Sequence, residues 1–152
     1  APLLSVYGGK ITTYRRLAEA AMTRLAPHLG ALAPWTAGST LPGGDFPVDG
    51  IEALLSETMR RWSFLTKPHA HRLLRAYGRR IERILKDAQC LDDLGPRFAG
   101  DLTGAEVRYL VENEWAQSAD DVLWRRSKLG LKATPEQSAA LGRFIASLQA
   151  RP

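Results

Sequence analysis

The stretch TGAEVRYLVENEW, residues 103–115, decides the fold class. Thr103 and Glu106 have the spacing of a capping box, in which the hydroxyl accepts a backbone N–H and the carboxylate returns a bond to the cap. Apolar side chains follow at the three- and four-residue spacing of an amphipathic helix: Val107, Leu110, Val111 and Trp115. The stretch therefore predicts a helix that begins after Thr103 and buries one face.

The same capping pattern occurs twice more downstream, and helical periodicity extends upstream. Ser118 stands three positions before Asp121, and Thr134 stands three positions before Gln137. An apolar run follows each of these pairs, as it does after a capping box. Apolar spacing predicts further helices over 51–62, 68–77 and 81–88. The predicted fold class is therefore mainly α, with about six to seven helices after residue 50.

The first thirty residues follow a different pattern. Residues 3–7 are apolar and partly β-branched, and Gly8 and Gly9 close the run, which predicts a buried strand and a tight turn. From Thr12 the period becomes that of a helix, which Gly30 ends. A lone strand needs a partner, and the later sequence offers no convincing one. We therefore expect this strand–turn–helix unit to be the end of a neighbouring domain, and the chain to be a fragment of a larger protein.

Composition limits the classes of function. The 152 residues carry a net charge of +5 and a single cysteine, Cys90, so no internal disulfide can form. No apolar run approaches the length that crosses a bilayer, and no signal peptide is visible. The basic excess permits an anionic partner, but acidic residues interrupt every basic run, so we expect no nucleic-acid binding.

The sequence predicts no metal site and no catalytic constellation. His69 and His71 are two positions apart, so on a helix they point in different directions and cannot share a metal ion. We expect them to be surface histidines. The carboxylate pairs at 92–93 and 120–121 stand at expected turns or helix starts, where capping explains them without any chemistry.

One short segment could hold an anion or an electron-rich carbonyl edge. Gly8 and Gly9 let the backbone come close to a ligand, and the helix start beyond them offers free N–H groups with a partial positive charge. Lys10 adds a full charge. The glycine spacing differs from that of a phosphate-binding P-loop.

Four runs resemble one enzyme family, the FAD-dependent, aerobic respiratory glycerol-3-phosphate dehydrogenases. Residues 8–19 resemble the end of the family's flavin domain, and residues 41–44 its linker. Residues 101–115 resemble a helix of its carboxy-terminal domain. The most specific match is the run ADDVLWRRSKLGL, residues 119–131, with its Arg-Arg pair, Lys and Gly.

The resemblance implies a domain organisation and a split site. Residues 1–30 would be a remnant of the FAD-binding domain, 31–50 a Pro- and Gly-rich linker, and 51–152 a helical cap domain. Cofactor contacts carried over by motif are Gly9, Lys10, Ile11 and Thr12, which would touch the flavin ring in the intact enzyme only. The resemblance assigns no catalytic residue and no metal ligand here.

The resemblance also implies an activity for the parent enzyme. It would oxidise sn-glycerol 3-phosphate to dihydroxyacetone phosphate and pass electrons through FAD to quinone. The expected location is cytoplasmic, peripheral at the inner face of the cell membrane. This chain alone is expected to bind no FAD and to be inactive. Its partners would be the missing FAD domain and a membrane surface.

Two questions stay open at this level. The chain could instead be a basic helical interaction module that docks a partner protein or an anionic membrane surface. Arg125, Arg126 and Lys128 could pair with acidic residues of the same domain or face a partner. Trp124, in the same run, is expected to anchor the core.

Overall fold

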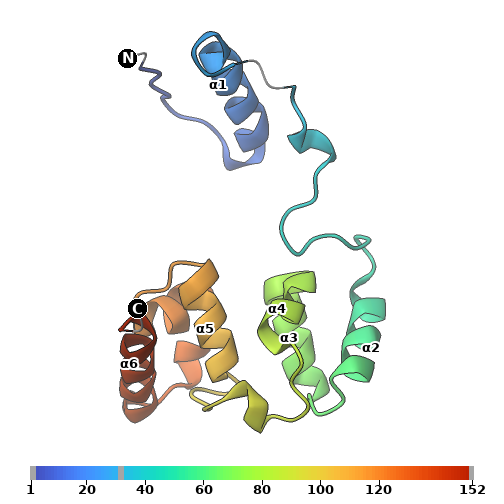
Figure 1. Ribbon diagram of the computed structural model, residues 1–152, viewed down its shortest axis with the longest axis vertical. Coiled ribbons are helices and arrows are strands. Elements are labelled where there is room, and N and C mark those ends of the chain that lie inside the picture. Colours follow the sequence, from blue (N-terminus) through green and yellow to red (C-terminus); the bar gives the residue numbers. More distant parts are fainter. Residues whose placement is uncertain (1–2, 31–32, 151–152) are drawn as a thin grey trace. The chain divides into compact units, whose positions relative to one another are not determined.

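The chain forms two compact units, residues 1–41 and residues 42–152. The computed structural model describes residues 3–30 and 33–150, so residues 31 and 32 of the predicted linker lie outside the described part. Figure 1 shows the course of the chain through both units. Each unit is described by itself.

Unit 1 (residues 1–41) is built around one long helix. Helix α1 spans Tyr14–Leu29, a short 3₁₀ turn over Ile11–Thr13 leads into it, and Gly30 follows its last turn with a φ of 85°. Arg15 and Glu19 pair at 3.1 Å on its surface. The helix predicted from Thr12 to Gly30 is therefore present.

The strand predicted over Leu3–Tyr7 is wrong. Residues 3–10 form no regular secondary structure, and the side chains of Leu3 and Tyr7 are almost fully exposed. A strand is stable only when a neighbour pairs with its N–H and C=O groups. No strand forms within residues 3–30 and 33–150, so this segment has nothing to pair with.

Unit 2 (residues 42–152) is helical, which confirms the mainly α class. Its α-helices are α2 (Ile51–Arg61), α3 (Lys67–Tyr77), α4 (Ile81–Leu85), α5 (Gly104–Asn113) and α6 (Pro135–Gln149). A π-helical segment over Asp121–Arg126 brings the described helices near the predicted six to seven. Every helix in the described residues is too short or too polar to cross a bilayer.

The three predicted capping boxes form to different extents. Thr134 and Gln137 exchange both bonds at the start of α6. Ser118 and Asp121 also bond to each other's backbone N–H, at 3.2 and 3.0 Å. At α5, Thr103 accepts from the N–H of Glu106, but the Glu106 carboxylate does not return a bond, because it points into the core.

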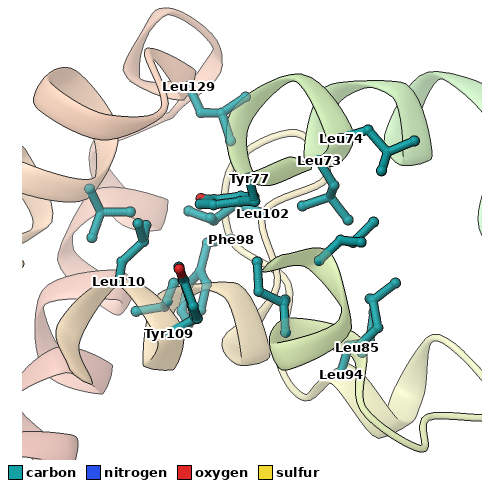
Figure 2. Close-up of a cluster of buried hydrophobic side chains, with 14 of the residues drawn as sticks. Leu73, Leu74, Tyr77, Leu85, Leu94, Phe98, Leu102, Tyr109, Leu110 and Leu129 are labelled. Carbon is teal, nitrogen blue, oxygen red and sulfur yellow. The ribbon is translucent and has the colours of Figure 1, made fainter. Parts of the chain in front are cut away.

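The core of unit 2 lies between helices from both halves of its sequence. Figure 2 shows Leu73 and Leu74 of α3 and Leu85 of α4 on one side and Leu110 of α5 on the other. All four leucines are buried. Trp124, the expected core anchor, is instead half-exposed, because the π-helical turn directs Val122 and Leu123 inward in its place.

Two glycines fasten the beginning of unit 2 to the turn after α3. Gly43 has a φ of 87° and Gly78 a φ of 53°. A Cβ on Gly43 would overlap the Tyr77 carbonyl oxygen, and one on Gly78 would overlap the Gly43 carbonyl oxygen. Arg79 donates its backbone N–H to that same Gly43 oxygen at 3.0 Å. The two backbones therefore touch directly, and this contact fixes where the linker joins the domain.

Alanine at either glycine should destabilise unit 2 by about 2 kcal/mol or more, because it adds both a steric overlap and left-handed backbone strain. Gly43→Ala and Gly78→Ala would be compared with Gly142→Ala, a helical glycine whose Cβ would meet open space. The control should gain about 0.5–1 kcal/mol. Urea unfolding followed by circular dichroism measures all three, and equal stabilities would contradict the backbone contact.

Candidate functional site

The four residues predicted to contact a flavin lie together on one exposed turn at the start of α1. Gly9 has a φ of 125°, and Lys10 is extended with a φ of −95°. Ile11 and Thr12 lie in the 3₁₀ turn that follows, and all four residues are exposed. Their contact with a flavin stays a prediction, since it needs atoms from outside this chain.

Two bonds fix the shape of this turn. The carbonyl oxygen of Lys10 accepts from both the backbone N–H and the hydroxyl of Thr13, each at 3.0 Å. A Cβ on Gly9 would lie 3.1 Å from Cδ2 of Leu17, so the glycine lets the turn pack closely on α1. The turn is thus a local structure that unit 1 holds by itself.

The charge around the turn is strongly positive. Unit 1 carries Lys10, Arg15, Arg16 and Arg24 against one carboxylate, Glu19. The hydroxyl of Thr36 donates to Glu19 at 2.6 Å; this bond, followed by those from Arg15, lowers the pKa of that carboxyl. With the partial positive charge of a helix start, this field suits an anion or an electron-rich ring edge.

The sequence did not predict the most tightly bonded polar group in unit 2. Glu106 is 0% exposed, and its two oxygens accept from Nη1 and Nη2 of Arg72, each at 2.8 Å. The hydroxyl of Tyr77 donates to the same carboxylate at 2.8 Å. A buried carboxylate is tolerated only when it is paired and hydrogen-bonded in this way, so Glu106 ties α5 to α3.

The Glu106 network continues on both sides. Nε of Arg72 forms an ion pair with Asp101 at 2.7 Å. Burial, the Glu106 charge and the bond to Glu106 all raise the pKa of Tyr77. Burial alone would lower the pKa of Arg72, but its carboxylate partners raise it overall. Tyr77 and Arg72 therefore keep their protons and remain hydrogen-bond donors to Glu106.

Tyr109 extends the network toward α4. The rings of Tyr77 and Tyr109 meet edge to face at 5.4 Å, and Figure 2 shows both rings between α3 and α5. Arg80 donates to the Tyr109 hydroxyl at 3.0 Å. The network is thus a structural connection, and it offers no nucleophile paired with a base.

His69 corrects another expectation, because it is buried rather than on the surface. Its Nε2 has no hydrogen-bond partner in the described structure, and burial lowers its pKa. The backbone N–H of His69 donates to the Thr66 hydroxyl at the start of α3. The described residues hold no group of three side chains able to bind a metal ion.

The charged run near residue 125 pairs within its own domain. Arg125 lies 2.6 Å and Arg126 3.8 Å from Asp121, and Arg126 donates to the Glu114 carbonyl at 2.8 Å. The backbone N–H of Gln117, with Arg125 and Ser118, lowers the pKa of Asp121 to about 2. Both arginines therefore pair within unit 2, and Arg125, whose side chain is 66% exposed, can also face a partner.

One cleft of about 700 Å³ opens in unit 2 beside α4 and the start of α5. Arg83, Lys86 and Arg108 line it, together with Asp87 and Glu112. Because charges of both signs are mixed along its walls, the cleft has no field that would select a small charged ligand.

The signals that would have found the Glu106 network are present in the sequence but were assigned elsewhere. Glu106 fits a capping box, and Arg72 falls between apolar positions of α3. Each of these charged residues stands among the apolar positions of its helix, and two such residues of opposite charge indicate a buried pair. The pairing itself spans 34 positions, and no local pattern reports it.

Comparison with known proteins gives a family match over most of the chain. Residues 34–151 match the family described as the C-terminal domain of alpha-glycerophosphate oxidase. A glycerol-3-phosphate dehydrogenase of Pseudomonas aeruginosa is 48% identical over 96% of this chain and 28% of its own length. The aerobic glycerol-3-phosphate dehydrogenase of Escherichia coli is 42% identical over 95% of this chain and 29% of its length.

A relative with a different name is similar to a comparable degree. The D-erythritol 1-phosphate dehydrogenase of Brucella abortus is 42% identical over 92% of this chain and 28% of its own length. The chain thus spans less than a third of the length of each of these three relatives.

Removing the buried carboxylate should destabilise unit 2 strongly. Glu106→Gln removes the buried one of the two carboxylates that pair with the Arg72 guanidinium, and we expect a cost of about 3 kcal/mol. Tyr77→Phe removes one bond and should cost about 1 kcal/mol. Glu82→Gln removes a half-exposed pair with Arg61 at 3.5 Å and should change stability by less than about 0.5 kcal/mol. Urea unfolding tests the order, and equal effects of Glu106→Gln and Glu82→Gln would contradict it.

Proposed function

Because the chain belongs to the family of the C-terminal domain of alpha-glycerophosphate oxidase, a domain of glycerol-3-phosphate dehydrogenases, we propose that it forms the carboxy-terminal part of an FAD-dependent glycerol-3-phosphate dehydrogenase. The intact enzyme would oxidise sn-glycerol 3-phosphate to dihydroxyacetone phosphate and deliver electrons to quinone. Unit 2 would be its helical cap, and residues 1–30 would complete its flavin domain.

The observation that carries this proposal is the exposed cationic turn from Gly9 to Thr12. Gly9 is exposed with a φ of 125°, and Lys10 lies just before the start of α1, so the turn carries positive charge. This arrangement fits the pyrimidine edge of a flavin, where negative charge accumulates on reduction. When bound, FAD would supply the hydride acceptor, and the turn would hold positive charge against it.

Helix α1 supports the same proposal through its apolar side chains. None of its residues is buried within unit 1, and Tyr14, Leu17 and Met22 remain exposed. An amphipathic helix gains stability by burying its apolar stripe against another element. The rest of a flavin domain would supply that surface.

The proposed substrate class is a polyol phosphate with a secondary alcohol. A relative named for D-erythritol 1-phosphate is as similar as the Escherichia coli glycerol-3-phosphate dehydrogenase. The cap therefore does not by itself select glycerol 3-phosphate. Assays of the intact enzyme should include both phosphates, with glycerol 3-phosphate expected to react faster.

A lysine substitution tests the role of the turn. In the intact flavoprotein, Lys10→Met should lower the flavin midpoint potential and slow dye-linked oxidation of glycerol 3-phosphate by about tenfold or more, because it removes a fixed charge beside the reduced ring. Arg60→Met, an exposed cation on α2, is the matched control and should change neither quantity.

The 152-residue chain alone should be colourless, since the turn is only one wall of the site. A stoichiometric flavin spectrum of the chain alone, or unchanged potential and turnover in Lys10→Met, would contradict the proposed site. Absence of glycerol 3-phosphate oxidation in the yellow intact protein would contradict the proposed activity.

A second candidate function, docking to an anionic membrane surface, is favoured by the same helix. Arg16 and Arg24 lie on the polar side of α1, and its apolar residues are uncovered within unit 1; this combination binds interfacial lipid. This role competes with the first for the apolar side chains of α1, because a flavin domain and lipid cannot cover them at once.

Charge reversal on α1 tests membrane docking. Arg16→Glu combined with Arg24→Glu in the intact protein should weaken co-sedimentation with phosphatidylglycerol vesicles by about tenfold or more at low salt. Arg60→Glu combined with Arg75→Glu reverses two exposed cations of unit 2 and should leave binding unchanged. Equal loss in both double variants would indicate only a net-charge effect and would contradict docking through α1.

A further inference from the structure

The run from Asp121 to Lys132 builds a half-exposed indole on an irregular backbone. It consists of the π-helical segment Asp121–Arg126, a left-handed Lys128 with a φ of 60°, and a 3₁₀ turn over Leu129–Lys132. Val122, Leu123 and Leu129 are buried beneath it and fasten it to the core. Trp124 remains 45% exposed, and Leu131 in the 3₁₀ turn is 81% exposed.

The indole is held rigidly. A Cβ on Gly130 would lie 2.6 Å from Cζ2 and 2.7 Å from Cδ2 of Trp124, so the ring rests directly on the glycine backbone. Only glycine leaves this space. The exposed face of the ring is therefore fixed in advance, which removes the entropy cost that a mobile side chain would pay on binding.

Several bonds keep the strained backbone in place. Ser127 donates its hydroxyl to the Val122 carbonyl at 2.7 Å and accepts from the N–H of Leu129 at 3.3 Å. Lys128 donates Nζ to the Trp124 carbonyl. Left-handed non-glycine residues and π-helical turns persist where the surroundings enforce them, and they concentrate at functional sites. The π-helical turn and the left-handed Lys128 are not explained by burial of Trp124, because that ring is half-exposed.

The rim of this surface is positive. Arg125 has a 66% exposed side chain, and Lys128 and Lys132 are also exposed. The Asp121–Lys132 run contains one acidic residue, Asp121, and this carboxylate is already paired with Arg125 and Arg126. We name this surface the Trp124 platform, formed by Trp124, Arg125, Lys128, Gly130, Leu131 and Lys132. Its complement is an apolar surface with a carboxylate rim.

We propose that the Trp124 platform docks onto the part of the intact protein that this chain lacks, at an apolar patch bordered by acidic side chains. The inference rests on the proposed function. The two relatives match 95–96% of this chain, but more than two thirds of their own length lies outside the matched part. In an intact protein of that length, the remaining part would be a partner on the same polypeptide. Trp and Arg are also the residues that dominate the energy of protein interfaces.

A protein partner fits the platform better than lipid does. Interfacial lipid binding needs an apolar face that sinks about 5–10 Å below the headgroups. The Trp124 ring lies flat on Gly130 and cannot extend outward, which leaves Leu131 as the one protruding apolar side chain of the platform. A flat, preorganised indole with a charged rim matches a shallow protein surface.

Residue-resolved hydroxyl-radical oxidation of tryptophan, read by mass spectrometry, tests the proposal. The 152-residue chain would be compared with the intact flavoprotein without lipid. Trp62, which is 3% exposed in the unit 2 core, is the internal buried reference. The oxidation rate of Trp124 should be well above that of Trp62 in the chain and should fall close to it in the intact protein.

Two surface variants sharpen the test. Leu131→Asp and Arg125→Glu in the intact protein should restore the Trp124 oxidation rate of the chain, whereas Arg75→Glu, an exposed cation on α3, should not. Equal Trp124 rates in chain and intact protein overturn the proposal, as does protection that appears only with phosphatidylglycerol vesicles. Flavin content and turnover of glycerol 3-phosphate are measured separately. An active enzyme in which Trp124 is not protected overturns the docking alone. A protein in which Trp124 is protected but glycerol 3-phosphate is not oxidised overturns the proposed activity alone.

Discussion

The architecture of unit 2 depends on one buried charge. Glu106 is fully enclosed, so its carboxylate must be paired, and its partners Arg72 and Tyr77 both come from α3. Leucine packing alone would tolerate small sliding of α3 against α5, since apolar contacts are not directional. Three hydrogen bonds to one carboxylate fix the two helices at a single register. The positions of the other helices of unit 2 then follow from this pair of helices.

Tyr77 links this constraint to the start of the unit. Its hydroxyl bonds to Glu106, while its backbone carbonyl lies against Gly43 at the end of the linker. The network that sets the core therefore also sets where the chain enters the domain.

Sequence patterns predicted what local chemistry controls and missed what distant partners control. The helix starts at Thr103 and Thr134 follow from capping residues a few positions apart, and the helices from apolar spacing. The strand over residues 3–7 failed because pairing requires another strand. Glu106 and Trp124 were misplaced because an Arg 34 positions away and a π-helical turn decide where they point. The proposed flavin contacts came from a resemblance, and they stay a prediction.

The contact between Gly43 and Gly78 has a consequence for how this domain can change over evolutionary time. Each glycine is required because a carbonyl oxygen occupies the place of its missing side chain: that of Tyr77 at Gly43, and that of Gly43 at Gly78. A first substitution at either position meets backbone, which cannot move aside as a flexible side chain can. A larger residue at either position therefore requires the two backbone segments to separate.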